Sequence, residues 1–79
     1  MEVGRIVCSK AGSDKDTFLV IVRTLGKMVF VSDGKRYKLA SPKKKNIKHL
    51  AATGEKLELK NIPTDKSLRV ALAKYRSNL

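Results

Sequence analysis

The sequence predicts a mainly β fold, a small barrel of about five short strands with one helix near the C-terminal end. Three observations predict it: short β-branched runs separated by turn residues, two runs that are apolar at nearly every position, and a last segment with helical periodicity. A chain of 79 residues holds one domain with a thin core. We expect the barrel over about residues 3–60 and the helix over about 64–76.

The first three strands are expected in the N-terminal half of the chain. Val3–Cys8 is a short β-branched run, and a loop rich in glycine, serine and aspartate follows it. Thr17–Thr24 and Met28–Ser32 are the next two strands, with a tight connection between them. Because both are apolar at nearly every position, we expect both faces of the sheet to be covered.

The remaining two strands are expected to be shorter and more polar. Asp33 and Gly34 predict a hairpin turn, since both residues tolerate a positive φ, and Arg36–Leu39 should return as the fourth strand. Asn46–Leu50 has the pattern of a single helical turn. Lys56–Lys60 alternates leucine with charged residues, which is typical of a half-exposed fifth strand.

The last segment has the features of an amphipathic helix. Thr64 is a good N-cap, and Asp65 complements the positive end of the helix dipole. Asp65 should also pair with Arg69 one turn later, for a few tenths of a kcal/mol. Four apolar residues share one face: Leu68, Ala71, Leu72 and Tyr75. We expect this face to pack on the barrel; the alternative is a helix that binds a partner.

Positive charge is concentrated in residues 35–54, which carry seven basic residues and no carboxylate and so supply +7 of the net charge of +11. Such a stretch indicates a polyanion-binding surface, because each lysine placed against a phosphate releases a condensed counterion. The alternative is a solvated lysine loop that only keeps the protein in solution.

The composition argues against an enzyme, a metal site and a cofactor. One histidine and one cysteine cannot build a Cys/His zinc site, and no glycine-rich phosphate loop occurs. Cys8 is expected to be a buried structural thiol, and a domain without disulfides fits the cytoplasm. Asp14 and Asp16 are expected to form turns in a flexible loop. The longest apolar run, Phe18–Val22, is far below the roughly 20 residues of a spanning helix.

The segment VGRIVCSKAGSDKDTFLVIV resembles a KOW motif, in which a strand beginning near a glycine leads through a glycine-containing loop into a second hydrophobic strand. MVFVSDG, KRYK and NIKHL follow, and Thr53 comes shortly after. In this order and spacing the chain resembles the fourteen-e family of large-subunit ribosomal proteins of archaea and eukaryotes, over about Val3–Tyr75. The matching positions are Gly4, Arg5, Gly12, Asp33, Gly34, Asn46, His49 and Leu50.

The resemblance implies an SH3-like, KOW-type β-barrel that binds structured ribosomal RNA through its basic loops. The chain departs from the motif at Asp16, where the KOW loop commonly has a second glycine. Aspartate visits the left-handed region more readily than most residues, so we expect the turn to survive with some strain.

We therefore expect a non-catalytic protein that binds ribosomal or other structured RNA, associates with the large ribosomal subunit and is monomeric off the RNA. The candidate RNA-binding residues are Lys10, Lys15, Arg36, Tyr37, Lys38, Lys43, Lys44, Lys45, Lys48 and His49. The lysines would contact phosphates as mobile charges, and Arg36 as a planar fork. Tyr37 either stacks on a base or packs in the barrel. His49 either bonds RNA or packs, partly buried, below the basic segment.

Two other classes of function remain alternatives. One is a protein-interaction domain, since small barrels bind protein partners. The other is attachment to an anionic membrane surface through the lysine run, at about 1 kcal/mol per basic residue. The sequence shows neither an amphipathic insertion helix nor a lipidation motif, so we expect no membrane partner.

Overall fold

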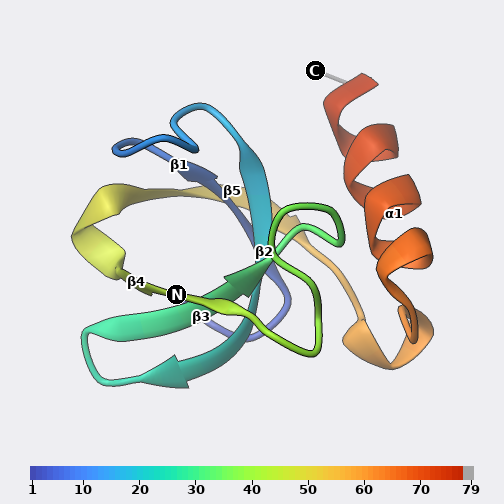
Figure 1. Cartoon of the computed structure of the whole chain (residues 1–79), viewed down its shortest axis with the longest axis horizontal. Helices are drawn as coiled ribbons and strands as arrows, with labels where there is room; N and C mark the ends of the chain where they lie inside the picture. The colour runs from blue at the N-terminus through green and yellow to red at the C-terminus, as the bar shows by residue number, and fades with distance from the viewer. Residues whose placement is uncertain (78–79) are drawn as a thin grey trace.

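The computed structural model describes residues 1–77, which form a five-stranded antiparallel sheet followed by a helix (Figure 1). The strands are β1 (Arg5–Ser9), β2 (Phe18–Leu25), β3 (Met28–Ser32), β4 (Lys43–Asn46) and β5 (Leu50–Lys56), and their order in the sheet is β4-β3-β2-β1-β5. Two 3₁₀ turns, η1 (Ile47–His49) and η2 (Leu59–Asn61), follow β4 and β5, and α1 (Asp65–Ser77) ends the described chain.

The sheet is open but strongly curved, so that the fold resembles a small barrel (Figure 1). Its two edge strands, β4 and β5, are consecutive in the chain and are joined by η1 alone. The pairing register shifts between Arg5 and Val7 in β1 and between Ile21 and Arg23 in β2, and irregularities of this kind increase strand bend and twist. The expected mainly β fold with about five strands and a C-terminal helix is confirmed.

Apolar side chains cover both faces of the sheet, as expected from the continuous apolar strands. The inner face carries the buried residues Val7, Leu19, Ile21, Val29, Val31 and Leu50. The outer face carries Ile6 and Val20, which form a second cluster with Ile62 and with Leu68 and Leu72 of α1. Because successive strand residues point to opposite faces, β1 and β2 contribute to both clusters.

The helix packs on the outer face of the sheet, and both its start and its apolar stripe were predicted correctly. The Thr64 hydroxyl accepts a hydrogen bond from the Ser67 amide at 3.1 Å, which caps the helix. Leu68 and Leu72 are buried, and burying each leucine contributes about 1.5–3 kcal/mol. Tyr75 meets Phe18 edge to face, with ring centroids 5.2 Å apart.

The fourth strand was predicted at the wrong place. Arg36–Leu39 lies in a loop, residues 33–42, and the partner of β3 is β4. The reason is local: Asp33 Oδ1 accepts hydrogen bonds from the amides of Lys35 and Tyr37, each at 2.9 Å, so the backbone is satisfied by a turn instead of a ladder.

The fifth strand was also misplaced, since β5 ends at Lys56, where the predicted strand begins. The alternating leucines, Leu57 and Leu59, both pack against the outer-face cluster, but from an irregular segment and η2. An alternation of five residues is too short to distinguish a strand from an irregular segment followed by a 3₁₀ turn. The helical turn expected at Asn46–Leu50 is confirmed as η1, which the Asn46 side chain caps.

The predicted ion pair between Asp65 and Arg69 does not form; each side chain instead binds the 33–42 loop. Asp65 Oδ1 accepts from the Leu39 amide at 2.7 Å, and Arg69 donates to the Gly34 carbonyl at 2.6 Å. Gly34 has a φ of 78°, and a Cβ at this position would overlap the backbone oxygen of Asp65. Helix and loop therefore meet with no room for a side chain at Gly34.

We expect Gly34→Ala to lower the free energy of unfolding by about 3 kcal/mol or more, because backbone strain and steric overlap add. This loss corresponds to roughly 10 °C or more in the midpoint of thermal unfolding, measured by circular dichroism. Gly26→Ala is the matched control: Gly26 also has a positive φ, 60°, but open space surrounds it. It should cost only about 1 kcal/mol. Equal losses in the two variants would contradict the close approach of α1 to Gly34.

Candidate functional site

A buried carboxylate, Asp14, connects the loop between β1 and β2 to the rest of the molecule. Its Oδ1 accepts hydrogen bonds from the Ser9 hydroxyl at 2.7 Å and from Lys45 Nζ at 2.9 Å. Its Oδ2 accepts one from the Tyr37 hydroxyl at 2.9 Å. Asp14 is only 4% exposed. One side chain thus joins β1, β4, the 33–42 loop and its own loop.

The charge of Asp14 is strongly favoured in the folded state. Burial by itself would raise the pKa of this carboxyl, but the hydrogen bonds from Lys45, Ser9 and Tyr37 outweigh burial and lower the pKa to about 2. For Tyr37, burial and the hydrogen bond to Asp14 raise the pKa, so its hydroxyl stays a donor. Asp14 was expected to form a turn, and its carbonyl does accept from the Thr17 amide, but the role of its side chain was missed.

The loop at residues 10–17 is held by its own hydrogen bonds, in contrast to the flexible loop expected. Asp16 has a φ of 71°, which confirms the left-handed conformation expected where the KOW motif has glycine. Its amide donates to the Ser9 carbonyl at 2.8 Å, and the Lys15 amide donates to the Gly12 carbonyl at 3.2 Å. The exposed Lys10 and Lys15 are therefore carried by a defined backbone.

The first loop, the 33–42 loop and the segment from β4 to η1 bring cations together at one end of the sheet. The Lys10 amide donates to the His49 carbonyl at 2.8 Å, which places the first loop beside η1 (Figure 1). The Arg36 guanidinium donates to the Ser13 hydroxyl at 2.7 Å, which places the 33–42 loop beside the first loop. We call this region the basic end; its exposed basic residues are Lys10, Lys15, Arg36, Lys43, Lys48 and His49.

Two lysines of the predicted triplet do not belong to the exposed charges of the basic end. The side chain of Lys45 is 12% exposed and forms an ion pair with Asp14, so it is not the mobile charge that the sequence suggested. Lys44 pairs across the strands with Phe30, whereas Lys43 and Lys45 pair with the buried Val31 and Val29. Lys44 therefore points to the opposite face of β4 from its two neighbours.

Other candidate residues also have different surroundings from those expected. Tyr37 is half-buried against the inner-face cluster, which favours the packing role over base stacking. His49 is exposed, which rules out the alternative that it packs partly buried below the basic segment. Lys38 lies where the 33–42 loop turns back, with its carbonyl bonded to Ser32 and Ser41. Cys8 is half-buried, not buried, and burial raises the pKa of its thiol.

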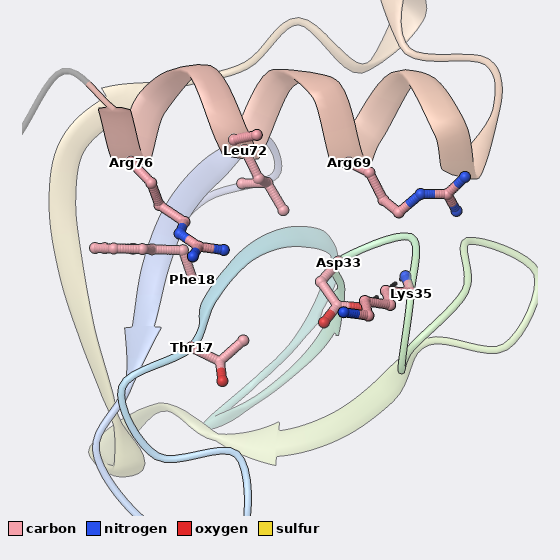
Figure 2. A pocket seen from close by; sticks show the side chains of 8 residues that line it. Thr17, Phe18, Asp33, Lys35, Arg69, Leu72 and Arg76 are labelled. Atoms are coloured by element: carbon pink, nitrogen blue, oxygen red, sulfur yellow. Dashed lines mark hydrogen bonds between the residues drawn. The ribbon is translucent and has the colours of Figure 1, made fainter.

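Sequence reasoning missed a second group of cations, on a groove between α1 and the 33–42 loop (Figure 2). They are Lys35, Arg69 and Arg76. A signal was present in the sequence, since Arg69, Leu72 and Arg76 follow the i, i+3, i+7 spacing of one helix face. It was overlooked because Arg69 had been assigned to an ion pair with Asp65.

No protein-family model matches the chain, and no curated protein matches its sequence significantly. Among residues 1–77, no helix is long and apolar enough to cross a membrane. The same residues hold no group of three or more His, Cys, Asp or Glu side chains with a geometry that suits a metal ion.

We expect the Asp14 carboxylate to contribute about 2 kcal/mol to the free energy of unfolding near neutral pH. Its pKa falls from 3.8 to about 2 on folding, so this contribution is present above pH 3.8 and is lost as the pH drops towards 2. Asp14→Asn should therefore lower the free energy of unfolding by at least this amount at neutral pH. As the pH drops from 3.8 towards 2, the stability of this variant should fall less steeply than that of the wild type. Urea unfolding between neutral and acid pH measures both effects.

Asp16→Asn is the matched control, because it removes an exposed carboxylate from the same loop and asparagine also tolerates a positive φ. This variant should keep most of the wild-type stability at neutral pH. An Asp14→Asn profile that parallels the wild type would show that the Asp14 network contributes nothing to stability.

Proposed function

We propose that the protein is a non-catalytic RNA-binding module that acts on ribosomal RNA in the cytoplasm, as a member or relative of the fourteen-e family of large-subunit ribosomal proteins. The observation that carries the proposal is the basic end, where hydrogen bonds gather exposed cations from three separate segments. The KOW-like first hairpin and the left-handed Asp16 support the family resemblance.

The arrangement suits a folded RNA better than a flexible strand. The cations of the basic end stand on a scaffold that the Asp14 network fixes, so their spacing is set before binding. Fixed spacing favours a backbone whose phosphates are also fixed, as in structured RNA. A platform for single strands requires exposed aromatic faces, and Tyr37 is instead hydrogen-bonded and half-buried.

Each residue of the basic end has a distinct part in this mechanism. Lys10, Lys15, Lys43 and Lys48 contact phosphates as mobile ammonium groups, each releasing a counterion. Arg36 is oriented by Ser13 and retains donors for a phosphate or a guanine edge. Lys45 acts indirectly, because its charge is neutralised by Asp14 and serves to hold β4 against the first loop.

The alternative of a protein-interaction domain has less support. The apolar stripe of α1 was the best candidate for a partner-binding surface, and its leucines are buried against the sheet. Pull-downs that survive nuclease treatment would favour this alternative. Sedimentation of a cell lysate through sucrose separates it from the ribosomal proposal: we expect co-migration with the large subunit at low salt and release at high salt.

Binding to a structured ribosomal RNA fragment should depend strongly on salt. If the five lysine and arginine side chains of the basic end each neutralise one phosphate, log affinity should fall with log salt at a slope of about −3.5 to −4.5. Fluorescence anisotropy with a labelled RNA hairpin measures the slope. An affinity that does not change with salt would contradict phosphate contacts.

The placement of the lysines, and not only their number, should decide affinity. We expect the triple variant Lys10→Ala, Lys43→Ala and Lys48→Ala to reduce the salt slope by about 2 to 3 and to weaken binding accordingly. Lys45 is left intact, because its removal would leave the buried Asp14 without its cation.

The matched control removes three exposed lysines elsewhere: Lys44, Lys60 and Lys66. It changes the net charge equally, so it should lose much less affinity than the first triple variant. Equal losses would mean that net charge alone attracts the RNA and that the basic end is not a binding surface. Circular dichroism should show that both variants keep the native fold.

A further inference from the structure

The groove between α1 and the 33–42 loop lies outside the basic end and has a different chemistry. It encloses about 220 Å³. Thr17, at the end of the first loop, and Phe18, the first residue of β2, lie opposite the helix, as Figure 2 shows. Lys35 lines it from the loop, and Arg69 and Arg76 line it from the helix. An apolar ring, a hydroxyl and three cations therefore face one small space.

The packing of the helix explains why both arginines line the groove, with Leu72 between them. Leu72 is buried against the sheet, and Arg69 and Arg76 lie one turn before and after it on the same face. Arg69 is held by its hydrogen bond to the Gly34 carbonyl, which uses one of its five donors. In Figure 2 the Arg76 side chain extends down beside the ring of Phe18.

The positive charge of the groove is only partly neutralised by its own lining, which has three cations and one carboxylate. Asp33 is the one carboxylate among the lining residues, and its Oδ1 accepts two backbone amides. Within residues 1–77 the ion pairs join Glu2 to Arg5 and Lys56, and Asp14 to Lys45, so none involves a groove cation. Three like charges in one concavity favour an anion.

We propose that this groove binds a single nucleotide, with Lys35 and Arg76 on its phosphate and Phe18 against its sugar and base. Arginine forks match phosphate oxygens in pairs, and an aromatic wall favours a nucleotide over inorganic phosphate. At about 220 Å³ the groove is smaller than a pocket that encloses a drug-sized ligand, so it would hold part of one nucleotide, with the rest in solvent, and it excludes a longer segment.

The inference rests on the proposed function where the nucleotide belongs to an RNA strand. Thr17 ends the loop that carries Lys10 and Lys15, and Lys35 precedes Arg36 in the chain, so the groove adjoins the basic end. An RNA bound at the basic end would direct one of its nucleotides into the groove. A free mononucleotide presents the same phosphate and the same base.

The test is a titration of ¹⁵N-labelled protein, followed by NMR, with adenosine monophosphate, with inorganic phosphate and with a short RNA hairpin. We expect the mononucleotide to shift the amides of Gly34, Leu72 and Ala73 and to bind more tightly than inorganic phosphate. Arg76→Gln and Lys35→Gln should each weaken mononucleotide binding about tenfold, the usual effect of one charged hydrogen bond.

Lys74→Gln is the matched control, since it removes an exposed cation from the same helix without touching the groove. It should leave mononucleotide binding unchanged. Equal effects of Arg76→Gln and Lys74→Gln, or equal affinities for inorganic phosphate and mononucleotide, would overturn the inference.

The RNA arm distinguishes the two proposals. If the hairpin binds, loses affinity with the Lys10, Lys43 and Lys48 substitutions and is indifferent to Arg76→Gln, the basic end stands and the groove proposal fails. If the mononucleotide binds in the groove but the hairpin does not bind at all, the groove is a site for free nucleotides and the proposed RNA-binding function fails.

Discussion

The structure depends on the ion pair between Asp14 and Lys45. Each of these groups alone would be costly to bury, because a charge removed from water needs a partner. Together with the hydroxyls of Ser9 and Tyr37, they form a hydrogen-bond network in which both oxygens of the Asp14 carboxylate have partners. This network adds to the loop's own backbone hydrogen bonds and joins the loop to β4 and to the 33–42 loop. The geometry of the basic end depends on it, because these hydrogen bonds join the loop to β4 and to Tyr37.

The 33–42 loop connects the two parts of the molecule that carry cations. On one side Tyr37 reaches Asp14 and Arg36 reaches Ser13, so the loop belongs to the basic end. On the other side Gly34 and Leu39 are bonded to the first turns of α1. The loop contains no regular secondary structure, but hydrogen bonds hold it on two sides, to the first loop and to α1. The helix thus completes the outer core and also supports the surface that we assign to RNA.

The sequence predicted the class of fold because its evidence was local. Continuous apolar runs indicated burial on both faces, and the spacing of Leu68, Leu72 and Tyr75 indicated a docked helix; both were correct. The two misplaced strands had equally good local patterns. They were displaced by contacts that the pattern does not contain: the side chain of Asp33 turning onto its own backbone, and β5 pairing with β1 before Lys56.

The candidate site was predicted less well, because a charge in the sequence does not say what neutralises it. Residues 43–45 look alike as three consecutive lysines, yet one is exposed in the basic end, one points to the opposite face of β4 and one is mostly covered and paired with Asp14. Strand alternation would have separated Lys44 if the strand had been placed correctly. The partner of Lys45 lies 31 residues earlier in the chain, and only the fold brings the two together. Counting cations therefore overestimates such a surface, whereas the contacts identify which charges remain free to meet a phosphate.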